Sequence, residues 1–248
     1  MSPTKSLPAT RYWIVGASEG LGRAIAHALD KRGASLVVSA RSEDKLKSLA
    51  GELRDATAVT VDVTDPASVA EAARRAGQFD GMIYSVGAYE PTKATQWDGD
   101  AVRLMIDTNI TGCVNVLSEV VPRFVAANKG HIALIGSLSG FRGLPGAVGY
   151  GLSKAAVMHT AENLRIDLSQ TDILVQRMNP GFIDTRLTEK NDFKMPQLMT
   201  PEEAAAHVLH AIDRRKFSHS FPRPFSWMFT VGQHLPIGWF QGLFKGLV

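Results

Sequence analysis

Two side chains in the second half of the chain have the types and the spacing of a proton-exchange site. Tyr150 and Lys154 are four residues apart at the start of an expected helix, which puts both on one face. A free phenol has a pKa near ~10, and a neighbouring ammonium lowers it, so Tyr150 could serve as general acid or base on an alcohol or carbonyl. Ser137, at the end of an expected strand, could hydrogen-bond the same substrate oxygen. The competing interpretation is an ordinary helix with a buried tyrosine and a solvated lysine.

A glycine-rich turn near the start of the chain favours the functional interpretation. Residues 11–16 are a short apolar strand and residues 23–31 have a helical pattern. Strand, glycine turn and helix form the setting of a nucleotide-phosphate site, because glycines let the backbone approach a pyrophosphate and the helix N-terminus offers free N–H groups. The turn is expected to bind the cofactor through Gly16, Ser18, Glu19, Gly20, Leu21 and Gly22.

The end of the second expected strand, residues 36–40, predicts which dinucleotide binds. An NAD site has an acidic residue here to hold the ribose 2′-hydroxyl, about 20 residues beyond the glycines. This chain has Ala40 followed by Arg41, which leaves room and positive charge for a 2′-phosphate. NADP(H) is therefore expected rather than NAD(H). Two points oppose the expectation of NADP(H). Arg41 could be a solvated residue at a helix start, and the carboxylate of Glu19 lies near the expected cofactor, where it disfavours a phosphate.

Further polar residues fall at the ends of expected elements. Asp62 and Val63, at the end of a third strand (residues 58–63), could meet the adenine ring. Asn109 stands among apolar residues, and a buried Asn needs partners. It either caps a break between a helix from about residue 97 and a second helix over 109–127, or orders water near the active site. Cys113 in this apolar stretch is expected to be buried filler rather than a nucleophile.

Strands alternate with helices along nearly the whole chain. Continuous apolar strands of this kind predict an α/β fold, a Rossmann-like doubly wound parallel sheet of about seven strands with helices on both faces, in a single domain. Ligands bind at the C-terminal ends of such strands. The residues expected at those ends are Gly16, Ala40, Gly87, Ser137 and Pro180.

The expected organisation has four parts. Residues 1–10 are predicted to be a flexible N-terminus, and residues 11–220 a dinucleotide-binding catalytic domain. Within it, residues at about 182–200 are polar and irregular between Pro180-Gly181 and Pro201, which indicates a mobile substrate lobe or a plain surface loop. Residues 221–248 form an apolar, aromatic C-terminal tail.

Taken together, these residues resemble the short-chain dehydrogenase/reductase family over about residues 11–216. The family's glycine motif is similar to Gly16, Gly20 and Gly22. Its Asn-Ser-Tyr-Lys catalytic set matches Asn109, Ser137, Tyr150 and Lys154, in order and in the expected elements. Its Pro-Gly motif after the sixth strand matches Pro180-Gly181, and the threonine that follows matches Thr185.

This resemblance implies a role for each matched residue. Tyr150 is the acid/base, Ser137 polarises the substrate oxygen, Lys154 binds the nicotinamide ribose and lowers the pKa of Tyr150, and Asn109 holds a water in a proton relay. Ile183 and Thr185 contact the nicotinamide amide region. Two positions depart from the family pattern: Val15 replaces a threonine, and residues 84–87 read Tyr-Ser-Val-Gly in place of Asn-Asn-Ala-Gly.

Composition excludes several other classes. The chain has 248 residues, a formal net charge of +3 and one cysteine. No long basic run suggests nucleic-acid binding, no internal disulfide can form, and no metal site is expected. The first ten residues have no apolar core like that of a signal peptide, and no apolar run approaches the ~18 residues of a membrane span. A cytoplasmic protein is expected.

The tail contains no acidic residue and many aromatic ones: Phe221, Phe225, Trp227, Phe229, Trp239, Phe240 and Phe244. It could cap the substrate pocket, pack on another subunit, or lie on a membrane surface. The first two are favoured because basic residues are few. Family members are commonly dimers or tetramers, so a homodimer or homotetramer is expected.

The sequence thus predicts an NADP(H)-dependent oxidoreductase, of the short-chain alcohol dehydrogenase or carbonyl reductase type. It interconverts a hydroxyl and a carbonyl on a hydrophobic small molecule. An apolar pocket is expected from Phe141, Leu144, Phe182, Met195 and the tail. The alternatives are a non-catalytic NADP(H)-binding sensor on the same fold, and a sugar-nucleotide epimerase or dehydratase, which usually has a larger C-terminal substrate domain.

Overall fold

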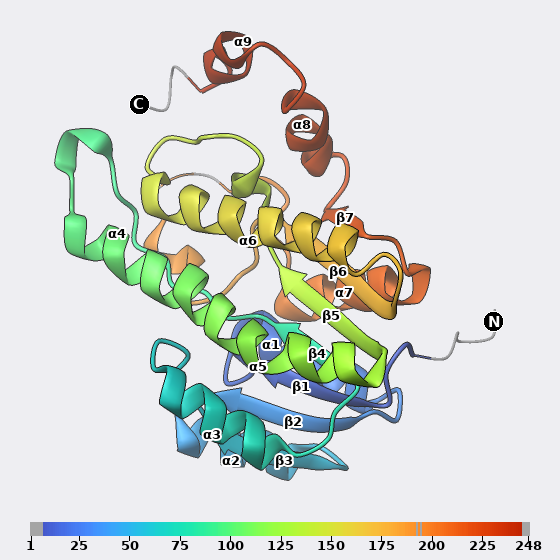
Figure 1. Cartoon of the computed structure of the whole chain (residues 1–248). Coiled ribbons are helices and arrows are strands. Elements are labelled where there is room, and N and C mark those ends of the chain that lie inside the picture. Colours follow the sequence, from blue (N-terminus) through green and yellow to red (C-terminus); the bar gives the residue numbers. More distant parts are fainter. Residues whose placement is uncertain (1–6, 192, 194, 245–248) are drawn as a thin grey trace.

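The computed structural model describes residues 7–191, 193 and 195–244 (Figure 1). Seven parallel strands form one sheet in the order β3-β2-β1-β4-β5-β6-β7. The strands are β1 (Arg11–Val15), β2 (Ser35–Ala40), β3 (Ala56–Thr60), β4 (Gly81–Tyr84), β5 (Lys129–Ile135), β6 (Asp172–Pro180) and β7 (Ser218–Phe221). The predicted doubly wound fold is confirmed, because the strand order reverses direction between β1 and β4.

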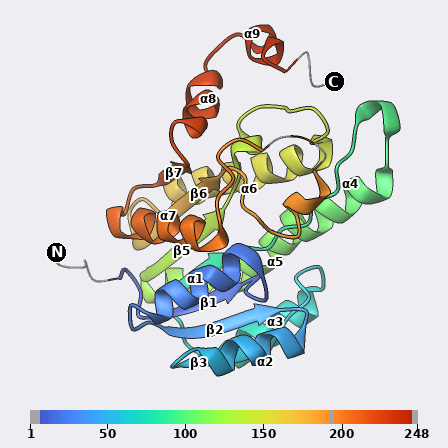
Figure 2. The ribbon, with the colours of Figure 1, turned by 180° about the vertical axis from the view of Figure 1, so that it is seen from behind.

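Helices cover both faces of the sheet and bury its apolar side chains. On one face lie α1 (Gly20–Asp30), α2 (Glu43–Glu52) and α7 (Pro201–Arg214), which pack on strand residues such as Ile14, Val38 and Met178 (Figure 2). On the other lie α3 (Pro66–Ala76), α5 (Gly112–Ala127) and α6 (Val148–Asp167), around Trp13, Val37 and Leu134. Strands buried on both faces explain the near-continuous apolar runs of the sequence.

Local signals in the sequence start several of these helices. The Asp65 side chain accepts the N–H of Ala67 with Pro66 at the first helical position, as expected. Thr200 and Glu203 form a reciprocal capping box at the start of α7. Asp98 accepts the N–H groups of Asp100 and Ala101 and starts α4 (Gly99–Ile106).

The two helices expected from about residue 97 and over 109–127 are joined. A π-helical turn, η2 (Asp107–Thr111), connects α4 to α5 without a gap, and it contains Asn109. The joined helix is long and apolar enough to cross a membrane by length and composition alone. In this fold, however, α5 packs against α3 and β5, and α4 packs against α6.

The two ends of the chain differ in how they join the sheet. Residues 1–6 of the predicted flexible N-terminus lie outside the described residues, whereas Ala9 is buried and the Thr10 N–H donates to Asp80. Phe221, the first residue of the expected tail, is the last residue of β7, a strand that the sequence pattern did not single out. The tail continues as α8 (Phe225–Gly232) and α9 (Ile237–Gly242), which project from the body of the molecule (Figures 1 and 2).

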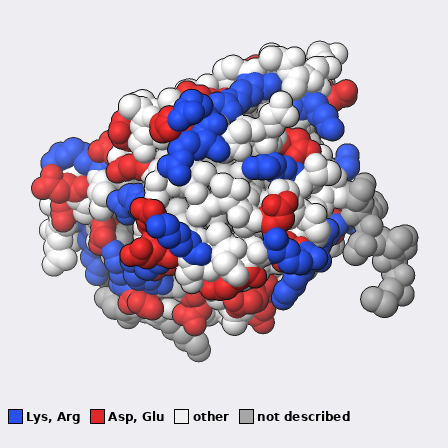
Figure 3. Space-filling model, turned by 90° about the horizontal axis from the view of Figure 1, so that it is seen from below, with Lys and Arg blue, Asp and Glu red and all other residues white. Residues whose placement is uncertain are grey.

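Charged side chains of both signs alternate over the face seen from below, where α2, α3 and β3 lie (Figure 3). Lys47 pairs with Glu43 and Arg74 with Glu71, each within one helix. The described residues of this face therefore form no continuous basic surface for a polyanion.

Candidate active site

A crevice of about 890 Å³ opens at the C-terminal edge of the sheet. It is lined by every residue that the sequence analysis assigned to the cofactor: Gly16, Ser18, Glu19, Gly20, Leu21, Gly22, Ala40, Arg41, Asp62, Val63, Gly87, Tyr150, Lys154, Pro180, Gly181, Ile183 and Thr185. These residues lie at or after the ends of five strands, β1, β2, β3, β4 and β6, and at the start of α6, and they meet because parallel strands end at one edge.

The glycine turn between β1 and α1 is shaped for close backbone approach. Gly16 has φ +92° and Gly20 φ +53°, conformations that side chains disfavour. A Cβ on Gly22 would lie 2.0 Å from the carbonyl oxygen of Gly16. Glu19 precedes α1 but makes no side-chain capping bond, and the first turn of α1 has no acidic residue. The free N–H groups and the dipole of α1 therefore suit a phosphate.

Backbone bonds hold this turn to the sheet where the sequence departs from the family pattern. The Gly16 N–H donates to the carbonyl of Ser39 at 2.7 Å, and the Ser85 N–H donates to that of Val15 at 2.8 Å. A Cβ on Gly16 would lie 2.8 Å from the backbone of Ser85. The side chains of Val15 and Ser85 are not needed for this contact, since main-chain groups make it.

The ends of β2 and β3 bring cations to one side of the crevice. Arg41 follows β2, and Lys45, one turn into α2, lines the crevice as well. Asp62 follows β3 rather than ending it. The side-chain hydroxyl and the N–H of Thr64 donate to its carboxylate, and these bonds, with the more distant Arg41, lower the pKa of Asp62. Asp62 is thus held as an anion within its own turn.

Lys154 is buried beneath the crevice, one helical turn from Tyr150. Its side chain is 3% exposed, and Nζ donates to the carbonyls of Ile135 at 3.1 Å and Val86 at 3.4 Å. The ammonium lies 5.8 Å from the centre of the Tyr150 ring. Burial lowers the pKa of Lys154 to about 8. The predicted placement of the pair on one helix face is confirmed.

The pKa of Tyr150 does not shift as expected from its sequence. Burial raises the pKa of this phenol to about 12, against the lowering effect of a hydrogen bond with Ser137, and Tyr89 raises it further. The prediction that Lys154 lowers this pKa is therefore wrong for the chain's own groups. The reason is that burial of the phenol is the largest contribution to its pKa, while Lys154 gives its hydrogen bonds to backbone carbonyls.

Ser137 and Asn109 lie behind the crevice surface. Ser137 follows β5, is buried, and accepts from the Ser139 hydroxyl at 2.9 Å. Asn109, fully buried in the π-helical turn, accepts the N–H of Ala88 at 2.7 Å and donates to the carbonyl of Ala88 and to Ser153 Oγ at 2.9 and 2.8 Å. It ties the loop after β4 to α6. Its part in a proton relay stays a prediction.

The expected substrate lobe crosses over the crevice and meets the loop after β4. The Tyr89 hydroxyl donates to Asn191 Oδ1 at 2.7 Å, and Lys190 pairs with Glu90. The Tyr89 ring packs edge-on to Tyr150, with centroids 5.0 Å apart. The sequence analysis missed Tyr89, Glu90 and Lys190. No local signal could reveal them, because each contact joins residues about a hundred positions apart in the sequence.

Aromatic rings connect the lobe to the tail. Phe182 contacts Phe193 and Phe225, and the row continues from Phe225 through Phe229 to Phe240. Phe141 and Leu144 pack on this tail cluster rather than lining the crevice. Phe182 and Met195 also lie outside the crevice lining, whose apolar side chains include Leu104, Ile183 and Leu187. The prediction that Phe141, Leu144, Phe182 and Met195 line the crevice is therefore wrong.

Comparison with known proteins assigns this arrangement to a family. The family model for short chain dehydrogenases matches residues 11–195. An uncharacterized oxidoreductase of Myxococcus xanthus is 37% identical over 218 residues, which cover 84% of this chain and 86% of that protein. The chain therefore belongs to the short-chain dehydrogenase/reductase family, and its fold and crevice are those of an oxidoreductase that uses a nicotinamide dinucleotide.

Two solved structures match almost the full length. A short-chain dehydrogenase from Sphingobium yanoikuyae, in complex with NADPH, has a TM-score of 0.81 and 28% identity over 95% of each chain. The bulky-bulky ketone specific alcohol dehydrogenase from Comamonas testosteroni has a TM-score of 0.77 and 25% identity, covering 95% of this chain and 94% of that one.

Proposed function

We propose that this protein interconverts a ketone and a secondary alcohol on a bulky, hydrophobic molecule, with NADP(H) as the cofactor. The observation that carries the proposal is the convergence of the glycine turn, Tyr150 and Lys154 on one crevice. A phosphate-binding turn and a proton-exchanging side chain within one cavity are what hydride transfer between carbon atoms requires.

In this reaction the residues of the crevice would have the following roles. The turn from Gly16 to Gly22 and the N-terminus of α1 hold the diphosphate, and Lys154 holds the nicotinamide ribose. The bound dinucleotide supplies or accepts the hydride. Tyr150, whose phenol is protonated at neutral pH, gives its proton to the substrate oxygen in the direction of reduction and takes it back in oxidation. Ser137, which already shares a hydrogen bond with Tyr150, orients that oxygen.

A preference for NADP(H) over NAD(H) is supported by the end of β2. Ala40 leaves space where an NAD site has a carboxylate, and Arg41 and Lys45 line the crevice beside it. The Sphingobium yanoikuyae structure, which is similar over its whole length, is a complex with NADPH.

A bulky substrate is supported by the tail. One of the two structures that cover 95% of this chain is a bulky-bulky ketone specific alcohol dehydrogenase. Here the tail packs around Leu138, directly after Ser137, so its aromatic row lies beside the position expected for the substrate. An oligomer stays part of the proposal, supported by exposed apolar residues on α5 and α6 such as Val114, Leu152 and Ile166. A cytoplasmic location stays an expectation from the sequence.

A substrate panel tests the proposal directly. Aryl-alkyl and diaryl ketones and acetone are assayed for reduction with NADPH and with NADH at neutral pH. We expect turnover of the bulky ketones with NADPH and weak activity on acetone. A tenfold or greater preference for NADH contradicts the assignment of Ala40 and Arg41, and NADPH binding without turnover of any ketone or alcohol contradicts catalysis.

A further inference from the structure

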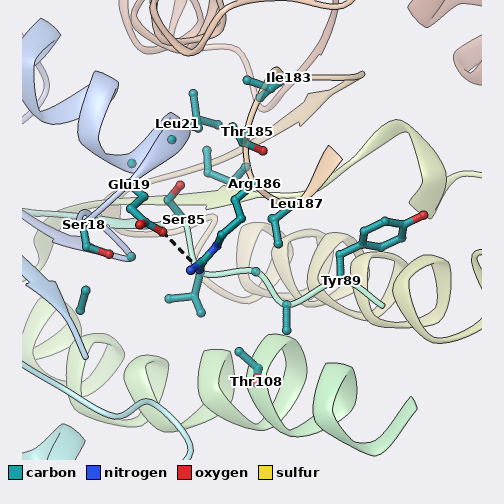
Figure 4. Close-up of a pocket in the computed structure, with 18 of the residues that line it drawn as sticks. Ser18, Glu19, Leu21, Ser85, Tyr89, Thr108, Ile183, Thr185, Arg186 and Leu187 are labelled. Atoms are coloured by element: carbon teal, nitrogen blue, oxygen red, sulfur yellow. Dashed lines mark ion pairs between the residues drawn. The ribbon is translucent and has the colours of Figure 1, made fainter. Parts of the chain in front are cut away.

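Three charged side chains meet over the nucleotide part of the crevice. Glu19, in the glycine turn, pairs through Oε1 with Lys45 on α2 and through Oε2, at 3.2 Å, with Arg186 of the substrate lobe. Figure 4 shows Arg186 reaching toward Glu19 between the elements that line the cavity. One carboxylate is thus shared by two cations that come from different sides of the crevice.

The positions of these cations match those of cofactor phosphates. Lys45 lies in the first turn of α2, four residues after Arg41 and beyond the strand end where this fold places the ribose 2′ position. Glu19 directly precedes α1, whose N-terminus suits the diphosphate, and Arg186 reaches it from the lobe. The carboxylate of Glu19 therefore occupies a place between two positions that suit phosphate groups.

The two ion pairs of Glu19 are exposed to solvent, so another anion can replace the carboxylate. The side chains of Glu19, Lys45 and Arg186 are 39%, 49% and 71% exposed, and ion pairs of this kind contribute little to stability. Lys45 and Arg186 lower the pKa of Glu19, which keeps its carboxylate ionised at neutral pH. A ribose 2′-phosphate has three acceptor oxygens and up to two charges, so it competes well with a carboxylate for Lys45. A dinucleotide diphosphate has four free acceptor oxygens and two charges, so it competes well for Arg186.

We propose that Glu19 is an exchangeable counter-ion, whose place at Lys45 and Arg186 is taken by the phosphate groups of the dinucleotide. Lys45 then binds the 2′-phosphate together with Arg41. Arg186 then binds the diphosphate and draws the lobe over it. Glu19 lowers the affinity for NADP(H), because its cations must be released before a phosphate can bind them. This inference rests on the use of NADP(H) proposed above, and it adds Lys45, Arg186 and Glu19 as residues that set cofactor affinity.

Binding measurements on three variants test the exchange without depending on turnover. Dissociation constants for NADPH and NADH are measured by fluorescence titration of Glu19→Gln, Lys45→Met and Arg186→Met. We expect Lys45→Met to weaken NADPH binding tenfold or more and NADH binding less than twofold. Glu19→Gln is expected to tighten NADPH binding at least threefold, and Arg186→Met to weaken both dinucleotides at least threefold. The matched control is the Glu43–Lys47 pair on the outer surface of α2. Glu43→Gln and Lys47→Met should leave both constants within twofold.

The outcomes separate this inference from the proposed function. Weaker NADPH binding in Glu19→Gln, or an unchanged constant in Lys45→Met, overturns the exchange while the use of NADP(H) stands. If the dissociation constants change as expected but the protein turns over no substrate, the exchange stands and the catalytic proposal is wrong. If the wild-type protein binds neither dinucleotide, both proposals fall.

Discussion

The two sides of the crevice are built in different ways. On the nucleotide side, main-chain geometry decides the shape: the Gly16 N–H is bonded to Ser39, and Gly22 packs directly on the carbonyl of Gly16. On the substrate side, side chains decide it, through Tyr89 with Asn191 and Phe182 with Phe225. The nucleotide side depends on glycines and strand ends, which other residues cannot replace without moving the main chain. The substrate side depends on side chains, which single substitutions can change, so we expect substrate preference to be set there.

The largest effect is expected where the two sides meet, at Tyr150. Tyr150→Phe removes the proton donor but keeps the ring that packs on Tyr89, so kcat should fall by about 10³-fold, within the usual range for general acid–base catalysis. The Kd for NADPH should stay within twofold, measured by titration. Full activity in this variant means that another group moves the proton. Tyr89→Phe is the control, because it keeps the ring that packs on Tyr150 and removes the hydroxyl that donates to Asn191.

On the nucleotide side, Gly22→Ala should disrupt the turn. The new methyl would lie 2.0 Å from the Gly16 carbonyl, so the turn must move and the diphosphate must lose backbone contacts. We expect NADPH affinity to fall about a hundredfold, or about 2.7 kcal/mol, together with a lower Tm. Gly51→Ala on α2 is the matched control, since a Cβ there meets no atom within 4 Å. A Gly22→Ala protein that binds NADPH normally would show that backbone approach does not shape this side.

The pH dependence tests the raised pKa of Tyr150. With a pKa of about 12, the phenol is protonated throughout pH 6 to 7.5, so kcat/KM for ketone reduction should be nearly flat in this window. Oxidation requires the phenolate, so its kcat/KM should rise about tenfold per pH unit. Lys154, with a pKa of about 8, stays largely charged over the same window. A kcat/KM for reduction that falls as pH rises through this window would contradict the raised pKa of Tyr150.

The smallest effect is expected on the substrate side. Phe225→Leu removes the aromatic ring that contacts Phe182 and Phe229 and leaves a smaller apolar side chain. We expect KM for a diaryl ketone to rise about fivefold, or about 1 kcal/mol, a typical loss for a few apolar contacts. The KM for acetone and the Kd for NADPH should not change. Trp227→Leu, at an exposed position of the same helix, is the control. If both variants raise the KM for the diaryl ketone equally, Phe225 makes no specific contact with the substrate.

The sequence alone determined the sheet, the glycine turn and those residues of the crevice that lie at strand ends or on the face of α6. These features depend on local rules: apolar strands, glycines where the backbone must approach closely, and Tyr150 and Lys154 one helical turn apart. The strand β7, with the polar sequence Ser-His-Ser-Phe, was not recognised, because its pairing with β6 rather than its own pattern makes it a strand. Likewise, Asn109 among apolar residues suggested a break between two helices, whereas a π-helical turn joins the helices there.

The tertiary structure alone decided the pKa of Tyr150, the bonds that fix Asn109, and the contacts of the lobe with the rest of the crevice. Burial raises the pKa of Tyr150, and no spacing in the sequence states how deeply a ring will be buried. Glu19, Lys45 and Arg186 come together from distant parts of the chain, since side-chain contacts across a cavity depend on where whole elements pack. The local sequence pattern determines which side chains stand at the strand ends. Only the packing of the elements determines which of these side chains are in contact, and the contacts and burial set their pKa values.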